Sequence, residues 1–318
     1  MKRILVTGAA GQVGTELVPA LRARFGSDAV LATDIRPPAE PGKGPFRTLD
    51  ALDARAVADA VASHRADTVY HLAAVLSATA ERNPQKAYGI NMNTLVNVLE
   101  VARERGLAVF VPSSIAAFGP STPADLTPQD TIQRPTSMYG VTKVAGELLC
   151  DYYAQRYGVD ARGVRYPGLI SYSAPPGGGT TDYAVEIFHH ALLHGRYTCF
   201  LAGDTQLDMM YMPDAVRASI EVMTADPQRL RHRNAFNVTA LQLTPETLAA
   251  AIRHHIPAFT IDYDVDPLRQ AIAESWPRRL DDSAARDEWG WKPEYDTSSM
   301  VADMLKQLAA RLGVTPAH

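Results

Sequence analysis

Short apolar runs alternate with longer amphipathic stretches over about the first 165 residues of the chain. The apolar runs carry Val, Leu and Ile at consecutive positions, which is typical of parallel strands that are buried on both faces. They begin at Arg3, Ala29, Thr68, Ala108 and Ala161. The stretches between them repeat their apolar residues with the period of a helix. The four helices that they predict cover about Gln12–Arg24, Asp53–Ser63, Ala87–Arg105 and Ser137–Tyr157. This alternation predicts an α/β fold: a Rossmann-type, doubly wound parallel sheet with helices on both faces.

The pattern changes at Pro167. The run of Pro and Gly at Pro175–Gly179 predicts a loop, a helix is expected over about Tyr183–Leu193, and the later strands are short and scattered among helices. We therefore expect a smaller, mixed α/β C-terminal lobe. Open α/β sheets bind their ligands outside the carboxyl ends of the strands, so this lobe is expected to cover that edge and to bind a substrate. The predicted boundary divides the chain into domains 1–166 and 167–318, whose segments can interleave.

The composition argues against several classes of protein. The 318 residues include 31 Lys and Arg against 35 Asp and Glu, a net charge of -4, which does not favour nucleic acid or an anionic membrane as a partner. The two cysteines, Cys150 and Cys199, form no CxxC pair, so neither a disulfide scaffold nor a thiolate metal site is expected. No apolar run approaches the ~20 residues of a membrane span. The apolar run near Met1 is too short for a signal peptide, and we expect a cytoplasmic protein.

Three glycines follow the first predicted strand. Gly8, Gly11 and Gly14 have the spacing GxxGxxG, and the first helix begins at once. The first glycine allows a tight turn, the second lets the backbone approach a pyrophosphate, and the third lets the helix pack closely on the strand. The positive end of the helix then faces the anion. This arrangement predicts a dinucleotide site, the alternative being a plain tight turn between a strand and a helix.

An acidic residue ends the second predicted strand. Asp34 stands 20 residues after Gly14, where a carboxylate accepts hydrogen bonds from the adenosine ribose and repels a 2′-phosphate. The sequence therefore predicts NAD rather than NADP. Arg36 leaves NADP open, because an arginine can receive that phosphate, and Asp34 could also be a solvated turn residue. Asp50 follows a third apolar step and is expected to meet the adenine amino group.

Tyr139 and Lys143 are four residues apart, which places both side chains on one face of a predicted helix. A phenol is a poor base because its unperturbed pKa is about 10, but neighbouring cations favour the phenolate. Ser113 and Ser114 end the fourth predicted strand, where a hydroxyl can hold a substrate oxygen against a base. Each feature is common by itself, since the Tyr/Lys spacing arises by chance and paired serines often cap a helix or form a turn.

The order of these features is more specific than any one of them. A glycine-rich turn, an acid, a serine at strand four and then YxxxK resemble, in this order, the extended short-chain dehydrogenases/reductases. Several strings narrow the resemblance: HLAAVLSATAERNPQKAYGINMNTLVNVLE, VPSSIAAFGP, IQRPTSMYGVTK, RYPGLIS, PPGGGTTDYAVEIFHHAL and MMYMPDA. They are similar to those of the L-threonine 3-dehydrogenases of the short-chain type. SWP at Ser275–Pro277 and DDSAARDEWGWKP from Asp281 extend the resemblance toward the C-terminus.

The resemblance implies NAD as the cofactor and a set of site residues. Tyr139 matches the general base, Lys143 its partner and a ribose ligand, and Ser114 the hydroxyl that positions the substrate, although the family often has threonine there. The other residues that the resemblance and the motifs place at the cofactor are Gly8, Gly11, Gln12, Val13, Gly14, Asp34, Ile35, Asp50, Ala51, Leu72, Ala73, Ala74, Asn91, Tyr166, Pro167 and Leu169. Those expected at the substrate, L-threonine, besides Tyr139 are Ser77, Ser113, Ser114, Gly179, Thr180, Thr181, Asp182 and Trp276.

Some of these assignments keep a structural alternative. Asp182 could face the substrate ammonium, while the Gly177–Thr181 loop binds the carboxylate, or it could cap the helix that follows. Trp276 could instead pack in the core. The three methionines of MMYM are expected to fill the core or an interface. No metal site is predicted, because the adjacent histidine pairs point in opposite directions and no HExxH or Cys/His cluster occurs.

The implied activity is NAD-dependent oxidation of L-threonine at its 3-hydroxyl to L-2-amino-3-oxobutanoate. Two other functions stay open: a nucleotide-sugar epimerase or dehydratase on the same scaffold, and a catalytically idle NAD-binding regulator. A homodimer is expected, because helices 87–105 and 137–157 pair with their symmetry mates in the resembling family and carry more apolar residues than one buried stripe needs. The glycines of Pro175–Gly179 are expected to let this loop close over the substrate.

Overall fold

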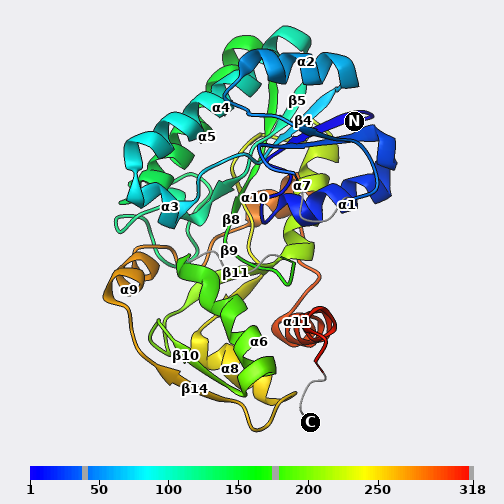
Figure 1. Cartoon of the computed structure of the whole chain (residues 1–318). Coiled ribbons are helices and arrows are strands. Elements are labelled where there is room, and N and C mark those ends of the chain that lie inside the picture. Colours follow the sequence, from blue (N-terminus) through cyan, green and yellow to red (C-terminus); the bar gives the residue numbers. More distant parts are fainter. Residues whose placement is uncertain (38–41, 174–178, 315–318) are drawn as a thin grey trace.

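The computed structural model describes residues 1–37, 42–173 and 179–314. In Figure 1 the chain forms two lobes, an upper one built on a parallel sheet and a smaller lower one in which strands and helices are mixed. The predicted fold class, a Rossmann-type sheet with a mixed C-terminal lobe, is confirmed.

The upper lobe is centred on one six-stranded sheet. Its strands are β1 (Ile4–Thr7), β2 (Val30–Asp34), β3 (Phe46–Thr48), β4 (Thr68–His71), β5 (Ala108–Phe110) and β7 (Asp160–Arg162). They lie in the order β3-β2-β1-β4-β5-β7, and all neighbouring pairs are parallel. The winding of the chain reverses between β1 and β4, which is where an open sheet of this kind leaves a crevice for a ligand.

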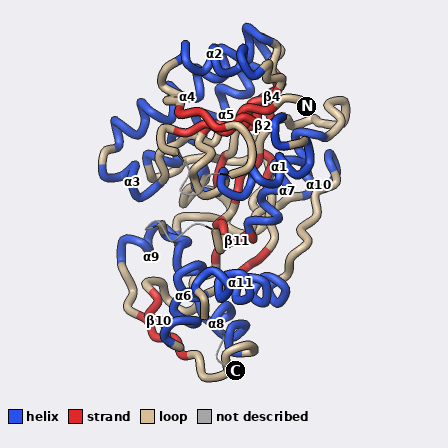
Figure 2. Tube along the Cα trace, turned by 45° about the vertical axis from the view of Figure 1, so that its right-hand side comes forward, coloured by secondary structure: helices blue, strands red, loops and turns tan. Residues whose placement is uncertain are grey.

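Helices cover both faces of this sheet, as Figure 2 shows. They are α1 (Gly14–Phe25), α2 (Ala54–His64), α4 (Pro84–Arg105), α5 (Met138–Tyr157), α7 (Met212–Thr224) and α10 (Ser283–Trp289). Leu5 of β1 is buried on the face of α2, α4 and α5, whereas Ile4 and Val6 are buried on the face of α1, α7 and α10. Because successive residues of a strand point to opposite faces, the continuous apolar run of β1 serves both cores.

Two predicted strands are divided in the structure. The run from Ala108 continues beyond β5 into β6 (Ser113–Ser114), and the run from Ala161 spans β7, β8 (Val164–Tyr166) and β9 (Gly168–Ile170). Gly163 separates β7 from β8, and a Cβ there would lie 2.0 Å from the carbonyl oxygen of Val111. Pro167, which has no N–H to donate, separates β8 from β9. The prediction of single strands is therefore wrong here. The breaks after β5 and β7 move the chain from the central sheet into the sheet of β6 and β8, and the break at Pro167 moves it from there into the sheet of β9.

Within the described residues, three smaller sheets complete the two lobes. β8 lies between β6 and β12 (Phe236–Asn237), and β11 (Leu207–Tyr211) lies between β9 and β13 (Leu241–Leu243). In the lower lobe, β10 (Arg196–Cys199) and β14 (Thr260–Tyr263) form a parallel pair. The other helices of this lobe are α6 (Tyr183–His194), α8 (Pro245–Arg253), α9 (Pro267–Glu274) and α11 (Thr297–Leu312). The remaining short helices are η1 (Ser27–Ala29), α3 (Ser77–Arg82), η2 (Ile115–Ala117) and η3 (Thr180–Asp182).

The buried cores do not divide at one point of the sequence. Residues of α7, β12 and α10 pack with β1 and α1 in one core, although they follow residue 167. A second core lies within the lower lobe, among α6, α8, α11 and β11. The chain thus crosses between the lobes more than once, and the domain boundary at 166/167 stays a prediction.

Most of the apolar residues that suggest a dimer in the sequence are buried inside the chain. This set is Leu95, Val98, Leu99, Val101, Val144, Leu148 and Cys150. All of them except Val144 and Leu148 belong to the core between α4, α5 and the sheet. These buried residues therefore do not support a dimer, because α4 and α5 pack on each other and on the strands, whereas Leu148 is exposed. The large apolar and aromatic side chains that the two helices expose are Tyr88, Val141, Leu148, Tyr152 and Tyr157.

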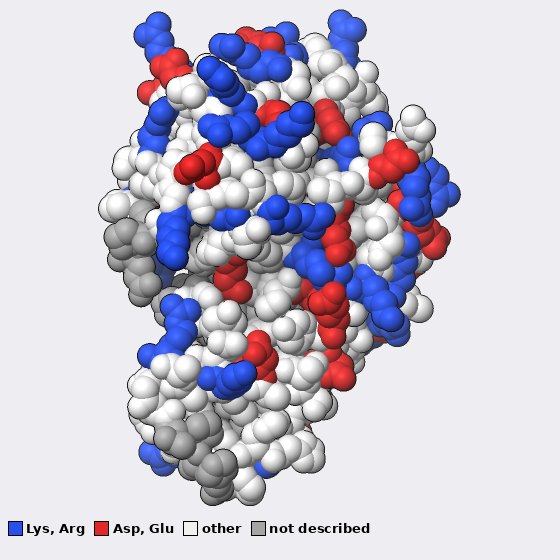
Figure 3. All heavy atoms as spheres, turned by 90° about the vertical axis from the view of Figure 1, so that its right-hand side faces the viewer, with Lys and Arg blue, Asp and Glu red and all other residues white. Residues whose placement is uncertain are grey.

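The surface carries charges of both signs. Figure 3 shows basic and acidic side chains interspersed on the face that includes α1 and α11, so this face presents a mixed electrostatic field rather than one of a single sign. Among the described residues, no helix combines the length and the apolar character that crossing a membrane requires.

Candidate active site

The loop after β1 has the geometry of a phosphate cradle. Gly8 has a φ of +68°, and a Cβ on it would lie 2.6 Å from the backbone nitrogen of Ala73. A Cβ on Gly14 would lie 2.6 Å from the carbonyl oxygens of Gly8 and Ala9. In the described part of the chain no side chain caps the N-terminus of α1, and the N–H groups of Thr15 and Glu16 donate to the backbone of the loop, so an anion here would meet the positive end of the helix. The loop that contains Gly11, Gln12 and Val13 therefore fits a pyrophosphate.

Asp34 lies buried beside this loop, at the end of β2. Its Oδ2 accepts a hydrogen bond of 3.0 Å from the N–H of Ala10, and its Oδ1 accepts one of 3.1 Å from the N–H of Arg36. A carboxylate has about four lone-pair sites, so both oxygens keep capacity for ribose hydroxyls. A fixed negative charge at this place fits NAD and opposes a 2′-phosphate.

Three further residues lie where the adenine end is expected. Ile35 is 63% exposed beside Asp34, and Ala51 is buried. Asp50 is exposed, and its Oδ1 accepts a hydrogen bond of 2.9 Å from the N–H of Leu52. This turn fixes the Asp50 carboxylate, and the contact with adenine stays a prediction.

Tyr139 and Lys143 lie one turn apart on α5, as the spacing predicts. Nζ of Lys143 lies 5.4 Å from the centre of the Tyr139 ring and donates a hydrogen bond of 2.7 Å to the carbonyl oxygen of Pro112. The Ser137 hydroxyl oxygen caps the helix by accepting a hydrogen bond of 3.1 Å from the N–H of Gly140. The first two turns of α5 therefore hold a phenol and an ammonium side by side.

Ser114 ends β6 and begins η2, against which α5 packs. Its Oγ accepts a hydrogen bond of 3.2 Å from the N–H of Ala116, which leaves the hydroxyl proton to donate. The approach of α5 is close because residue 140 is a glycine: a Cβ on Gly140 would lie 2.2 Å from the carbonyl oxygen of Ala116. Gly140 thus lets the turn after Ser114 meet the turn that carries Tyr139.

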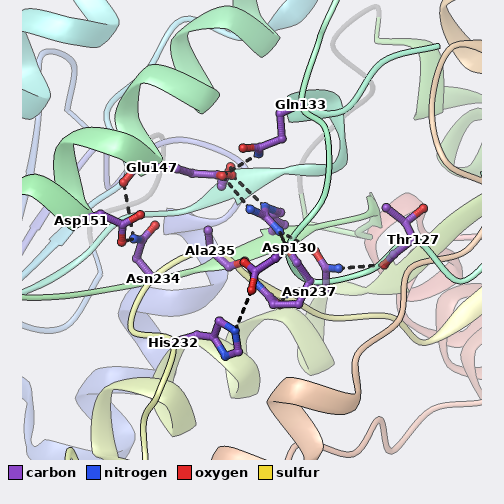
Figure 4. A network of polar contacts seen from close by, with 12 residues as sticks. Thr127, Asp130, Gln133, Glu147, Asp151, His232, Asn234, Ala235 and Asn237 are labelled. Atoms are coloured by element: carbon purple, nitrogen blue, oxygen red, sulfur yellow. Dashed lines mark hydrogen bonds and ion pairs between the residues drawn. The ribbon is translucent and has the colours of Figure 1, made fainter. Parts of the chain in front are cut away.

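The hydroxyl of Ser113 points elsewhere. It donates to the carboxylate of Glu147, which forms an ion pair of 2.8 Å with Arg165; these side chains are 6% and 7% exposed. Figure 4 shows the polar side chains around this pair, with Gln133 directed at Glu147. A serine has one hydroxyl proton, and that of Ser113 is used here. This placement differs from the expectation for Ser113 and leaves Ser114 as the serine with a proton for a substrate.

A cavity of about 40 Å³ borders Lys143, and its lining includes His71 and Cys150. Burial, with the nearby charge of Lys143, lowers the pKa of His71 to about 3, and its Nδ1 lies 2.9 Å from Oγ1 of Thr7. Burial raises the pKa of the Cys150 thiol. The lowered pKa makes the His71 imidazole a weak base, and the Cys150 thiol keeps its proton, so neither group competes with Tyr139 as a base. In the described ranges, no group of three His, Cys, Asp or Glu side chains is placed to hold a metal ion.

Two residues expected at the nicotinamide half face the scaffold. The side chain of Asn91 accepts a hydrogen bond of 2.7 Å from the N–H of Val75 and donates to the Val75 carbonyl and the Thr142 hydroxyl, both at 3.1 Å. It therefore fixes the segment after β4, which contains the predicted cofactor residues Leu72, Ala73 and Ala74. The Tyr166 hydroxyl is buried against α7, where it meets Ser219. Pro167 and the half-buried Leu169 follow it on the path into β9.

The predicted substrate residues of η3 pack against β9. A Cβ on Gly168 would lie 2.7 Å from the methyl carbon of Thr181, so the glycine allows this contact. Thr180 is buried beside it. The N–H of Gly179 donates a hydrogen bond of 2.7 Å to Oδ2 of Asp182, and among the described residues no side chain caps α6. Asp182 therefore does not cap α6 with its side chain, but its bond to Gly179 is a capping-box contact at the start of η3, which runs directly into α6. Residues 174–178, where most of the predicted lid falls, lie outside the described residues.

Trp276 is the residue through which the lower lobe contacts the site. It is half-buried and packs near Ile115, the residue after Ser114. The N–H of Arg278 donates a hydrogen bond of 2.8 Å to the carbonyl oxygen of Ala124, which holds this segment against the upper lobe. On the other side, Ser77 begins α3, which packs against α5. The structure therefore gathers elements from both lobes around Ser114 and Tyr139.

Two charged residues of the site were missed from the sequence. Glu147 stands four residues after Lys143 on the buried face of the helix, and Arg165 stands in a buried strand. Charged side chains are almost never fully buried unless they are paired. The sequence did hold a signal for this pair: Glu147 is a charged residue within an apolar helix face, and Arg165 is one within an apolar strand. Two opposite charges at buried positions indicate that the two side chains pair.

The chain is similar to known proteins in sequence and in fold. The model of the NAD dependent epimerase/dehydratase family matches residues 4–239. A relative from Staphylococcus saprophyticus, named an uncharacterized epimerase/dehydratase, is 55% identical over 314 residues, with 98% of each chain covered. The structure of L-threonine dehydrogenase from Clostridium difficile is 51% identical, with a TM-score of 0.96 and 98% of each chain covered. A monomeric L-threonine 3-dehydrogenase from a metagenome is 43% identical, with a TM-score of 0.93 over 97% of this chain and 99% of the other.

The matched range includes the glycine-rich turn, Asp34, Ser114, Tyr139 and Lys143. It covers about three quarters of the chain, and the solved structures extend the likeness to nearly all of it. The chain belongs to the NAD-dependent epimerase/dehydratase family, with a fold near-identical to that of L-threonine 3-dehydrogenases of the short-chain type.

Proposed function

We propose that this protein oxidises L-threonine at its 3-hydroxyl with NAD and forms L-2-amino-3-oxobutanoate. The observation that carries the proposal is the face of α5 on which Tyr139 and Lys143 lie beside the Ser114 turn. The similarity to L-threonine dehydrogenases over nearly the whole chain supports the choice of substrate.

Three side chains share the proton chemistry. Bound NAD supplies the acceptor for the hydride that leaves C3 of the substrate. Tyr139, as phenolate, takes the proton of the 3-hydroxyl. Ser114 donates a hydrogen bond to the same oxygen and holds it against the phenol. Lys143 keeps its positive charge beside the Tyr139 ring, which favours the phenolate. The product is a β-keto acid and loses carbon dioxide readily unless another enzyme consumes it.

The substrate also brings a carboxylate and an ammonium, which both need partners in a closed site. We assign the hydroxyls of Thr180, Thr181 and Ser77 to the polar groups of the amino acid, and the carboxylate of Asp182 to its ammonium. Trp276 completes the wall on the side of the lower lobe, where it packs near Ile115.

We also propose that two copies associate through the exposed face of α4 and α5. Val141, Leu148 and Tyr152 follow one another at seven and four residues, so they share one face of α5, and each is more than 40% exposed. Two-fold symmetry would place the same patch on both subunits. One similar dehydrogenase is described as monomeric, so this assembly needs its own measurement. The expected location is the cytoplasm.

A nucleotide-sugar epimerase or dehydratase is the second candidate, because the family and the Staphylococcus relative carry that name. Such enzymes bind a second diphosphate, and a dehydratase uses an acid beside its catalytic serine, where this chain has Ile115. An idle NAD-binding regulator would need neither Tyr139 nor Lys143 in this arrangement.

One assay separates these functions. NADH formation is followed with L-threonine, D-threonine, L-serine and UDP-sugars side by side, and UDP-sugar products are analysed in parallel. We expect NADH with L-threonine well above the other compounds. Conversion of a UDP-sugar without oxidation of L-threonine would favour the epimerase, and NAD binding without any turnover would favour the regulator.

A further inference from the structure

A buried carboxylate on α5 accepts four hydrogen bonds. Oε1 of Glu147 accepts from the Ser113 hydroxyl and, at 3.0 Å, from Nε of Arg165. Oε2 accepts from Nη2 of Arg165 at 2.8 Å and from the Gln133 amide at 2.7 Å. Nη1 of Arg165 continues the network, at 2.8 Å, to the carbonyl oxygen of Gln129. Ser113 belongs to β6 and Arg165 to β8, and Figure 4 shows Gln133, from the segment before α5, directed at the Glu147 carboxylate.

The same face of α5 meets the segment Pro112–Ser114 at three levels. Residues 139, 143 and 147 are four apart and therefore lie on one side of the helix. Lys143 donates to the carbonyl of Pro112, Glu147 accepts from Ser113, and the turn after Ser114 packs against Gly140. A rotation of α5 would break both hydrogen bonds together. The position of Tyr139 relative to Ser114 is therefore tied to Glu147.

An ion pair as deeply buried as Glu147–Arg165 is expected to add little to the free energy of unfolding. Removing two charges from water often costs more than their attraction returns, and well-packed apolar side chains would hold the helix at least as firmly. The charges instead fix the relative orientation of α5 and β8, because a carboxylate and a planar guanidinium pair in a defined bidentate geometry. A hydroxyl and a phenol that must share one substrate oxygen require such a fixed geometry.

We propose that Glu147, held by Arg165, is a positioning residue that sets β6 against α5, so that Ser114, Tyr139 and Lys143 converge on the substrate oxygen. The inference rests on the alcohol oxidation proposed above. It assigns Ser113 to this network and requires no contact between Glu147 and the substrate.

Ser113 gives the mildest test, because removal of its hydroxyl leaves the ion pair in place. In Ser113→Ala we expect kcat to fall about tenfold or more, since small displacements of reacting groups are costly. KM for the alcohol should change little, and Kd for NAD should not change. Ser113→Thr keeps a hydroxyl and should restore most of kcat. A raised KM with an unchanged kcat would place Ser113 at the substrate instead, and wild-type kinetics in Ser113→Ala would overturn the positioning role.

Glu147→Gln gives a second, electrostatic signature. The charged groups around Glu147 are Arg165 on β8 and, one helical turn away on either side, Lys143 and Asp151. Loss of the carboxylate leaves Arg165 without its counter-charge, and the added positive potential favours the phenolate. The plateau of kcat should fall, and the acid limb of its pH profile should move to lower pH. A lower Tm with wild-type kcat per folded molecule and an unshifted pH profile would show a merely structural residue.

A matched control is an ion pair on the surface. Glu100 and Arg103 on α4 form a contact of 2.6 Å, and both side chains are 39% exposed. Glu100→Gln should leave kcat, KM and the pH profile unchanged. All variants are compared on whichever alcohol of the panel the wild type oxidises. Failure of the wild type on L-threonine would then refute the proposed substrate, whereas equal kcat values for Ser113→Ala and the wild type would refute the positioning role.

Discussion

Nζ of Lys143 donates a hydrogen bond of 2.7 Å to the carbonyl oxygen of Pro112, so the ammonium is anchored to the segment that carries Ser114. The same nitrogen lies 5.4 Å from the centre of the Tyr139 ring. The positive charge is therefore fixed beside the phenol by the fold itself. A charge that is already in place needs no reorganisation when the phenolate forms, which is how preorganised sites lower a barrier.

The first prediction concerns the base. Tyr139→Phe removes the proton acceptor and keeps the ring, so kcat should fall by ~10²–10⁴-fold while Kd for NAD stays unchanged. Steady-state kinetics and a fluorescence titration with NAD measure the two quantities. As a matched control, Tyr152→Phe alters an exposed phenol on the same helix and should have wild-type kcat. A Tyr139→Phe variant with more than about a tenth of the wild-type kcat would remove Tyr139 from this role.

The second prediction concerns cofactor choice. The fixed carboxylate of Asp34 should favour NAD over NADP by ~10²-fold or more in kcat/KM, since opposed like charges cost several kcal/mol. Asp34→Ser combined with Ile35→Arg replaces the carboxylate and adds a cation at an exposed position. In this double variant the ratio of kcat/KM for NAD to kcat/KM for NADP should fall strongly. Comparable use of both cofactors by the wild type would contradict the assignment of Asp34 to the ribose.

The third prediction concerns association. Leu148 is 61% exposed on α5, so Leu148→Glu should turn the proposed dimer into a monomer without a large loss of stability. Light scattering at micromolar concentration measures the mass. Leu193→Glu, at a 47% exposed site on α6 of the lower lobe, is the matched control and should remain dimeric. A monomeric wild type would refute the dimer.

The fourth prediction concerns stability and pH. Burial raises the pKa of Asp208 to about 7, against hydrogen bonds from Thr239 and the N–H of Leu280 that lower it. A carboxyl in an unfolded chain titrates near pH 4, so between about pH 4 and 7 the folded state binds this proton more tightly than the unfolded state. The contribution of Asp208 to stability is therefore largest below about pH 4 and is lost as pH rises toward 7, by up to ~4 kcal/mol.

Urea unfolding at several pH values between about 5 and 8 measures this slope. Asp208→Asn should flatten it, because the amide does not titrate. Asp59→Asn, on the exposed side of α2, should keep the wild-type slope. The same slope in Asp208→Asn and in the wild type would show that another group causes the pH dependence.

The pattern of apolar residues was enough to predict β1, β2, β4 and β5 and the helices α1, α2, α4 and α5, because these strands are continuous apolar runs between amphipathic stretches. It did not predict β3, whose residues are partly exposed, or α7 and α10, which cover one face of the sheet from the part of the chain after residue 167. It could not predict the divided strands. The break at Gly163 depends on the carbonyl of Val111, which lies between β5 and β6, far away in the sequence. Local patterns carry no information on such a contact.

In the candidate site too, local features could be predicted from the sequence, whereas contacts between distant residues could not. The spacing of Tyr139 and Lys143 predicted a shared helix face, which is a local property. The direction of the Ser113 hydroxyl depends on Glu147, 34 residues later, and could not be found from the pair of serines alone. Five of the seven apolar residues that suggest a dimer in the sequence are buried within the chain, because an apolar position on a helix does not say whether the sheet or a second subunit covers it.

The fate of one hydrogen atom tests the central claim most directly. L-threonine deuterated at C3 is incubated with the wild type and NAD, and the reduced cofactor is analysed by mass spectrometry. The proposed reaction predicts one deuterium in the nicotinamide ring of the product, with none transferred by Tyr139→Phe above its residual rate. Reduced cofactor without deuterium, or no reduced cofactor at all, would contradict oxidation of L-threonine at its 3-hydroxyl.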